Sequence, residues 1–290
     1  MSLLNGHLGW VMMRDRGRIR EVVASRYAAR LRRLYADFLA GRWAPANSDA
    51  TGHPLSLTSW RPRLPDLPLV LLSLLCQSIR PSSTHVWLSS VDHALMDPSV
   101  MEKFSFHGVR FERCDDLGPH KKWLPMIESG MCDPFVICDD DILYPRDWLK
   151  HLLHEDRNDA YVGVRCHRIR YDDKGNPLSY EKWSRDIPWS PSPSQDLFIT
   201  GCGGAIIYPD RIYGEFRDRE AIFEKCPRAD DIWLKAAHAA AGMPCYKTRF
   251  SFPCLEIPGT GATSLMQTNV DAGGNDRQLS AIHDLLKYAE

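Results

Sequence analysis

The stretch Pro134-Phe135-Val136-Ile137-Cys138-Asp139-Asp140-Asp141 decides the fold. Its apolar run has the length of a central strand, because a strand buried on both faces shows no polar alternation. The chain before it favours, in order, a strand at 55–60, a buried helix at 65–79, a strand at 84–89, a strand near 109–112 and a helix at 119–130. Strands alternating with helices predict right-handed βαβ units and a parallel sheet. We therefore expect an α/β fold with a mostly parallel central sheet.

The second half of the chain is less regular. A long ordered loop is expected at 172–195, where such loops are usually functional. The other predicted elements are a strand at 160–164, a strand at 198–208 that contains glycines, a helix at 229–241 and a last helix at about 277–288. We expect residues 55–290 to form one main domain, and residues 1–54 to form an N-terminal helical extension and linker.

Residues 14–42 contain nine arginines and no lysine. Apolar side chains recur within them at the helical spacing of three and four, namely Val23, Tyr27, Leu31, Leu34 and Phe38. A basic amphipathic helix of this kind has two interpretations. It packs on the domain with its basic face in solvent, or it attaches the protein to an anionic membrane surface or to a partner.

Bulk properties exclude several classes of protein. The 290 residues carry a formal net charge of −1, so no basic field favours nucleic acid as a partner. Nine cysteines at scattered spacings, with no CxxC pair, do not resemble a disulfide framework or a zinc ribbon. No apolar run approaches the roughly 20 residues that span a bilayer. With no evident secretion signal, we expect a cytoplasmic protein, peripheral at the inner face of the membrane if the basic helix attaches there.

The three aspartates stand at the carboxyl end of the predicted strand, where open α/β sheets bind ligands. Adjacent carboxylates repel one another, and hard oxygen ligands suit Mg²⁺ or Mn²⁺. Alternation along an extended chain predicts that Asp139 and Asp141 point one way and Asp140 the other. The alternative is a solvated acidic turn.

Three further segments carry candidate site residues. Asp230 and Asp231 begin the helix at 229–241, where acids serve as caps or, alternatively, as a general base. The run Thr200-Gly201-Cys202-Gly203-Gly204 predicts a bulge or a close approach between backbone and ligand. Lys121 and Lys122 lie near a predicted helix start, where they are either exposed or placed to meet a diphosphate.

The order of these motifs resembles bacterial glycosyltransferases of the GT-A type, similar to family 2 and to capsule and surface-polysaccharide transferases. The resemblance covers residues 55–285. The matching pieces are 57–60, 118–123, 138–145, 200–209 and 227–234.

This resemblance implies a GT-A-like domain that uses a nucleoside-diphosphate sugar as donor and a saccharide or a lipid-linked saccharide as acceptor. Asp139 and Asp141 look like the ends of the family's DxD motif, where Mn²⁺ or Mg²⁺ joins the diphosphate. Asp140 is expected to orient the turn or to contact the ribose or the sugar. Thr58, Ser59 and Trp60 look like the nucleotide-binding edge, assisted by Lys121 and Lys122. Gly203, Gly204 and Trp233 fall on the acceptor side.

Asp231 matches the catalytic aspartate of the family, but Asp230 stands where the family usually has Glu, so both remain candidates for the base. The implied reaction is an inverting, hexosyltransferase-like displacement. Two alternatives stay open: a metal-dependent nucleotidyltransferase or phosphohydrolase, and a non-catalytic sugar-binding protein.

Overall fold

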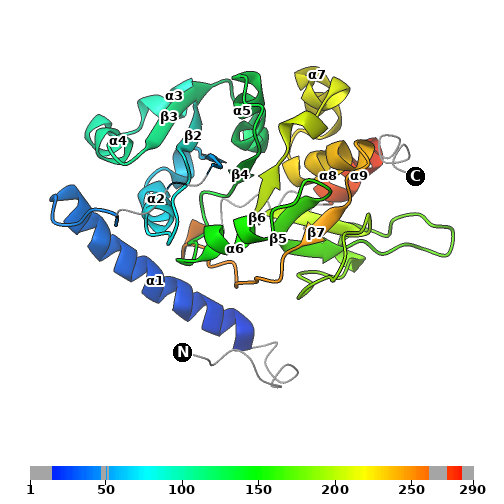
Figure 1. Cartoon of the computed structure of the whole chain (residues 1–290), viewed down its shortest axis with the longest axis horizontal. Coiled ribbons are helices and arrows are strands. Elements are labelled where there is room, and N and C mark those ends of the chain that lie inside the picture. The colour runs from blue at the N-terminus through cyan, green and yellow to red at the C-terminus, as the bar shows by residue number, and fades with distance from the viewer. Residues whose placement is uncertain (1–14, 47–49, 51, 261–272, 283–290) are drawn as a thin grey trace.

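The computed structural model describes residues 15–46, 50, 52–260 and 273–282. A seven-stranded sheet lies at its centre, with strands in the order β3-β2-β1-β4-β6-β5-β7 (Figure 1). The strands are β1 (Leu55–Thr58), β2 (Thr84–Ser89), β3 (Val109–Cys114), β4 (Phe135–Ile137), β5 (Tyr161–Arg168), β6 (Leu197–Ile207) and β7 (Cys245–Lys247). The helices are α1 (Asp15–Leu39), α2 (Leu67–Leu75), α3 (Ser90–Ala94), α4 (Pro98–Ser105), α5 (Leu124–Glu128), α6 (Trp148–His154), α7 (Arg219–Lys225), α8 (Asp230–Ala240) and α9 (Gly274–Ala281).

All strands of this sheet run in the same direction except β6. The pairs β1–β2, β1–β4, β2–β3 and β5–β7 are parallel, whereas β6 is antiparallel to both of its neighbours, β4 and β5. The α/β class with a mostly parallel sheet flanked by helices is therefore confirmed.

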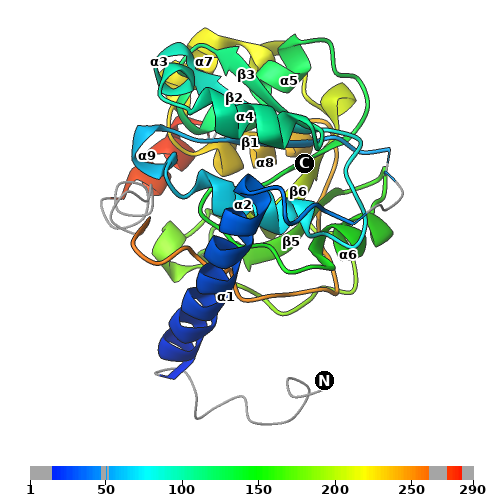
Figure 2. The same cartoon turned by 90° about the vertical axis from the view of Figure 1, so that its left-hand side faces the viewer.

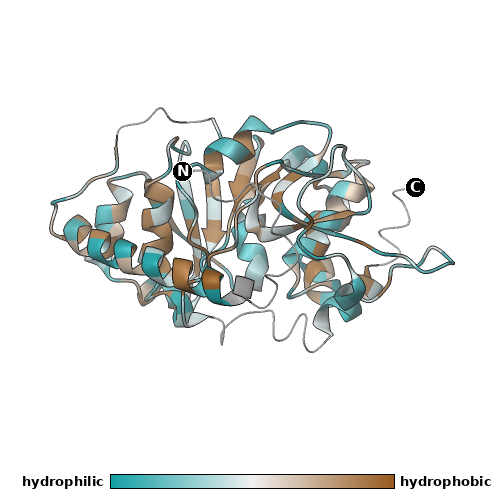
Figure 3. Cartoon of the chain, turned by 90° about the horizontal axis from the view of Figure 1, so that it is seen from below, coloured by the Kyte–Doolittle hydropathy of each residue, from teal (hydrophilic) through white to brown (hydrophobic). Residues whose placement is uncertain are grey.

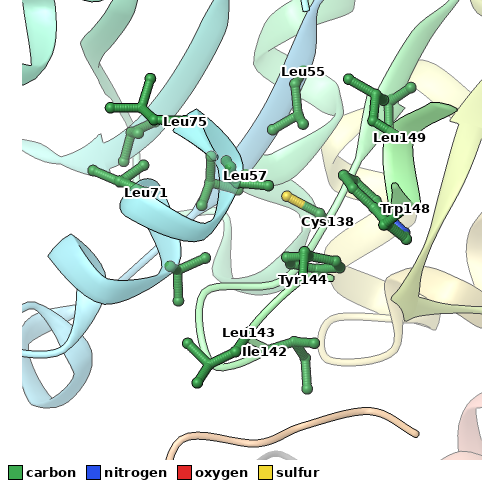
Figure 4. Close-up of a cluster of buried hydrophobic side chains, with 14 of the residues drawn as sticks. Leu55, Leu57, Leu71, Leu75, Cys138, Ile142, Leu143, Tyr144, Trp148 and Leu149 are labelled. Atoms are coloured by element: carbon green, nitrogen blue, oxygen red, sulfur yellow. The ribbon is translucent and has the colours of Figure 1, made fainter. Parts of the chain in front are cut away.

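The apolar run before the aspartates is buried on both faces of the sheet. Val136 and Cys138 lie in a core with α1, α2 and α6, whereas Phe135 and Ile137 lie in a second core with α5 and α8. Figure 4 shows Cys138 in the first core, among leucines of β1 and α2 and the rings of Tyr144 and Trp148. Hydrophobic residues accordingly concentrate on the strands and on the helix faces that cover them (Figure 3). Coverage of both faces explains why this segment has no polar alternation.

Helix α1 packs on α2 through only part of its length. Ala24, Ala28, Leu31 and Phe38 are buried in the first core, but Val23, which the sequence placed on the same stripe, is 44% exposed. The N-terminal end of α1 extends away from the rest of the molecule (Figure 2). None of the helices in the described residues is both long and apolar enough to cross a membrane.

The helix predicted over 119–130 is divided in two. A 3-10 turn, η2 (Gly118–Lys122), precedes α5, and Trp123 between them has φ −132° and ψ −42°. Pro119 and Pro125 lack the N–H that a continuous helix needs, so each begins a short element. The last helix begins earlier than predicted, at Gly274, and the part predicted beyond 282 lies outside the described residues.

Several short elements were not predicted: α3, α4, α6, α7 and β7. Each has eight residues or fewer, which is little more than two helical turns. Hydrophobic periodicity is weak over such lengths, and packing against the sheet decides the structure instead.

The glycine-rich segment of β6 is a bulge. Gly163 pairs with Ala205 and Arg165 pairs with Thr200, so residues 201–204 of β6 lie opposite one residue of β5. Gly204 has φ +89°, and a Cβ there would lie 2.3 Å from the ring of Trp148. Of the two interpretations of these glycines, the bulge is confirmed. Close packing against Trp148 requires a glycine at 204.

Replacing Gly204 with alanine tests this packing. We expect Gly204→Ala to lower the free energy of unfolding by about 2–5 kcal/mol, since overpacking adds to the cost of a positive φ. Gly108→Ala is the matched control, because Gly108 has φ +87° with open space around it. It should cost only about 1–2 kcal/mol. Urea unfolding measures both, and equal losses would contradict the packing account.

Candidate active site

The three aspartates lie at the carboxyl end of β4, in a loop that a tyrosine holds. The backbone N–H of Asp139 donates to the Tyr144 hydroxyl at 2.9 Å, and that hydroxyl donates to the Cys202 carbonyl at 3.2 Å. The Tyr144 backbone N–H in turn donates to Ser73 of α2 at 3.2 Å. The loop is thereby fixed to both β6 and α2.

The expected alternation of the aspartates is wrong, because the chain turns at Asp140 and Asp141. Both of these carboxylates meet Arg63, at 2.6 Å from Nη1 for Asp140 and 2.9 Å from Nη2 for Asp141. Ser59 also donates to Asp140 at 2.5 Å. Burial raises the pKa of Asp140 despite Arg63, and burial together with Asp140 raises the pKa of Asp141 well above its usual value.

Lys122 joins this loop to the start of α8. Its Nζ lies 2.8 Å from Asp139 Oδ1 and 2.8 Å from Asp230 Oδ2, and its side chain is only 6% exposed. Burial alone would lower the pKa of Lys122, but the carboxylates of Asp139, Asp230 and Asp231 raise it well above its usual value. The ammonium is therefore a permanent positive charge between two acidic motifs.

Strand β6 brings these motifs together. It runs antiparallel to β4 with Ala205 opposite Ile137, so residues 204 to 201 continue past the end of β4 beside the aspartates. A Cβ at Gly201 would lie 2.6 Å from Lys122 Nζ and 3.0 Å from Asp231 Oδ1. Only glycine lets the lysine and the aspartate approach this closely.

Asp230 and Asp231 differ in their surroundings. Asp230 is buried and paired with Lys122, whereas Asp231 is half-buried and accepts a hydrogen bond from the Gly201 backbone N–H at 2.9 Å. Burial, followed by the neighbouring Asp230 carboxylate, raises the pKa of Asp231 well above its usual value. A carboxylate with a raised pKa is a stronger base than an ordinary aspartate.

The residues predicted to bind the nucleotide differ in their exposure and in their partners. Thr58 donates to the Trp87 carbonyl at 2.8 Å, and Trp60 is 44% exposed beside the Arg63 turn. The ammonium of Lys121 pairs with the exposed carboxylate of Asp116 at 2.9 Å, so it does not join the pairs of Lys122. The two adjacent lysines therefore have different roles in the structure.

The residues assigned to the acceptor side are engaged in packing. Trp233 is fully buried, and its indole N–H donates to the Phe216 carbonyl at 3.0 Å, so it is a core residue without a surface for a sugar. A Cβ at Gly203 would lie 2.5 Å from Cβ of Arg165. Gly204 is constrained in a similar way by the ring of Trp148. Tight packing accounts for these three residues, and contact between the glycines and an acceptor stays a prediction.

Sequence reasoning missed Arg63, Tyr144 and Cys202. Arg63 follows β1 in the turn Arg61–Arg63, a position that signals proximity to the end of β4 only once the strand order is known. Cys202 Sγ lies 3.7 Å from Cys254 Sγ and 3.5 Å from Arg165 Nη1. The Cys254 thiol and, after it, Arg165 lower the pKa of Cys202 to about 6 against the effect of burial. Scattered cysteines gave no signal for this pair.

The carboxylates fit a divalent metal that is shared with a ligand. In the described part of the chain, four of the five aspartates form ion pairs with Lys122 or Arg63, and Asp231 lies beside them. These ion pairs engage one oxygen each of Asp139 and Asp141. Magnesium in nucleotide sites is usually held by one or two carboxylates together with substrate phosphates. The part of the chain that the structure describes contains no group of three or more His, Cys, Asp or Glu placed to hold a metal alone.

Comparisons with known proteins show distant structural similarity only. No protein-family model and no curated protein matches the sequence. The inositol-1-phosphate CTP transferase from T. maritima matches with a TM-score of 0.41 at 10% identity, over 69% of this chain and 86% of that one. The glycosyltransferase GlyE of Streptococcus pneumoniae TIGR4 matches with a TM-score of 0.38 at 9% identity, over 78% of this chain and 50% of that one. An apo UDP-glucose pyrophosphorylase matches with a TM-score of 0.38 at 10% identity, over 80% of this chain and 98% of that one. At these values the similarities do not identify a reaction.

The two lysines allow a matched test of the central ion pairs. We expect Lys122→Met to lower the free energy of unfolding at neutral pH by about 3–5 kcal/mol, because it leaves the buried carboxylate of Asp230 and the partly buried one of Asp139 without their cation. Lys121→Met should cost less than about 1 kcal/mol, since its partner Asp116 is 70% exposed. Urea unfolding of both variants decides the matter, and a Lys122 variant as stable as the Lys121 variant would refute the bridging role.

Proposed function

We propose that this chain is an inverting glycosyltransferase that moves a sugar from a nucleoside-diphosphate sugar to a hydroxyl of a saccharide or lipid-linked acceptor, in bacterial surface polysaccharide synthesis. One observation carries the proposal. Two acidic motifs 91 residues apart, at Asp139 and Asp230, lie within 2.8 Å of a single buried ammonium. The two acidic motifs are thereby adjacent, which supports a diphosphate site beside a catalytic base.

Asp139 and Asp141 would hold Mn²⁺ or Mg²⁺ together with the donor diphosphate. The metal would supply Lewis-acid stabilisation of the departing diphosphate. Arg63 and Lys122 contribute fixed positive charge on either side of the same loop, and they also keep its carboxylates in place. Ser59 holds Asp140, which supports a positioning role for that residue rather than a ligand role.

Asp231 is the preferred base. Its carboxylate is the more accessible of the pair, and the Gly201 backbone N–H orients one oxygen while the other remains for the acceptor hydroxyl. The acceptor oxygen attacks the anomeric carbon, and the bond between that carbon and the diphosphate breaks. The hydroxyl proton of the acceptor passes to Asp231. Asp230 is committed to Lys122, which favours a supporting role.

The nucleotide is assigned to the edge formed by Thr58, Ser59 and Trp60, where the half-exposed indole of Trp60 offers a stacking surface. A cytoplasmic enzyme with a lipid-linked acceptor would work at the inner face of the membrane. The exposed arginines of α1 support peripheral attachment there, since basic amphipathic helices bind anionic lipid surfaces.

Paired aspartate variants test the reaction and the base together. We expect Asp231→Asn to reduce transfer by about 10²–10⁴-fold, because that is the usual contribution of a general base. Binding of the nucleotide, and its dependence on Mn²⁺ or Mg²⁺, should remain. Asp230→Asn is the comparison at the neighbouring residue. Any loss of transfer in this variant should accompany a loss of stability, because Asp230 pairs with Lys122, whereas Asp231→Asn should stay stable.

The assay is a screen of nucleoside-diphosphate sugars with candidate acceptors, in which released nucleoside diphosphate is measured with and without metal. Release of inorganic diphosphate from a nucleoside triphosphate would instead identify a nucleotidyltransferase. Near-normal turnover of Asp231→Asn beside an inactive Asp230→Asn would move the base by one residue.

The raised pKa of Asp231 predicts a distinctive pH profile. The base acts only when it is ionised, so kcat/KM should fall as the pH is lowered through this pKa. Because the pKa is raised, the fall should occur well above the range near 4 where an ordinary aspartate titrates. A profile that stays flat down to about pH 4 would contradict the assignment of Asp231 as the base.

A further inference from the structure

A pocket lies between α1, the end of α2 and the segment before α6. It has a volume of about 350 Å³, within the range of small-ligand sites. Its walls include the rings of Tyr27 and Trp43 and the thiol of Cys76, and its charged groups include Arg30, Arg33 and Arg146. The proposed transfer reaction uses none of these residues, although Arg30 and Arg33 are among the exposed arginines of α1 that are proposed to face the membrane.

The three arginines form a concentration of positive charge without a matching acid. Arg30 and Arg33 are one helical turn apart on α1, and Arg146 comes from the loop that follows the aspartates. The only acid in the wall, Asp37, is engaged by Arg42 at 2.6 Å. Among the described residues, none of the three arginines makes a salt bridge. Like charges held together in this way favour an anion.

Arg30 and Arg146 line the pocket together with Cys76. Burial raises the pKa of the Cys76 thiol, while Arg30 and then Arg146 oppose that effect. Two arginines from distant parts of the chain therefore act on one sulfur atom at the pocket wall. A phosphate placed there would receive hydrogen bonds from more than one planar fork.

We propose that this pocket binds a phosphate-bearing anion, either a phosphate monoester or a diphosphate, through Arg30, Arg33 and Arg146. Tyr27 and Trp43 provide apolar walls for the group that carries the phosphate. Such a ligand comes from one of two sources, a soluble phosphate compound or the headgroup of a phospholipid.

The pocket is linked to the aspartate loop. The Tyr27 hydroxyl donates to the Tyr144 carbonyl at 3.1 Å, and Tyr144 holds Asp139 through its own hydroxyl. Arg146 follows two residues later in the same loop. An anion that fixes Arg146 against α1 would therefore also stabilise the loop. The binding itself does not depend on the proposed transferase activity.

Alkylation of Cys76 reports occupancy at this pocket alone. The full chain is treated with iodoacetamide, and Cys76 is followed by peptide mass spectrometry with the exposed Cys132 as an internal reference. We expect inorganic pyrophosphate or phosphatidylglycerol vesicles to slow alkylation of Cys76 severalfold and to leave Cys132 unchanged. Sodium chloride at equal ionic strength and phosphatidylcholine vesicles are the controls.

Variants connect any protection to the arginines. Arg30→Gln combined with Arg146→Gln should raise the concentration for half-protection by about tenfold or more, since charge-assisted hydrogen bonds are lost. Arg26→Gln, on the same helix but outside the pocket, should leave it unchanged. Asp139→Asn should also leave it unchanged, which separates this pocket from the proposed diphosphate site.

Protection by vesicles but not by pyrophosphate would assign the ligand as a lipid headgroup, and protection by pyrophosphate would show that a soluble phosphate suffices. Either result supports the pocket. Unchanged alkylation of Cys76 with both probes, or protection that persists equally in the double arginine variant, would overturn the proposal.

Discussion

The ion pairs of Lys122 are the constraint on which the candidate site depends. One buried ammonium pairs with carboxylates from the loop after β4 and from the start of α8. Burying either carboxylate without this cation would cost several kcal/mol, so the three groups are stable only together. The glycine at 201 and the reversed direction of β6 then follow as conditions for bringing them into contact.

A second level of organisation is the division of the core by the sheet. The strand before the aspartates is covered on one face by α2 and α6 and on the other by α5 and α8. Because the strand is buried on both faces, the position of its end is fixed. The start of the loop that carries the aspartates is therefore fixed as well.

Much of this arrangement could be predicted from the sequence because periodicity and apolar runs report burial directly. The strand at 84–89 was evident in this way, and so was a helix within 65–79, which is shorter in the structure at Leu67–Leu75. The bulge in β6 was indicated by its glycines instead. The ion-pair partners of the aspartates could not be predicted. Arg63, in the turn after β1, and Lys122, in η2, lie near the aspartates only because of the strand order, which the sequence does not reveal. Trp233 shows the reverse error: it lies within a recognised motif, but burial assigns it to the core.

The bulge at residues 201–204 leaves backbone groups that the neighbouring strands do not pair. Side chains replace those partners: Asp231 accepts from Gly201, Tyr144 donates to Cys202 and Trp148 donates to Gly203. Detaching the aspartate loop or α8 would therefore leave main-chain groups of a central strand unsatisfied, at a cost of about 1–3 kcal/mol for each that stays buried. Local opening of the site is thus tied to opening of the sheet, and amide hydrogens around the bulge should exchange as slowly as those of the core strands.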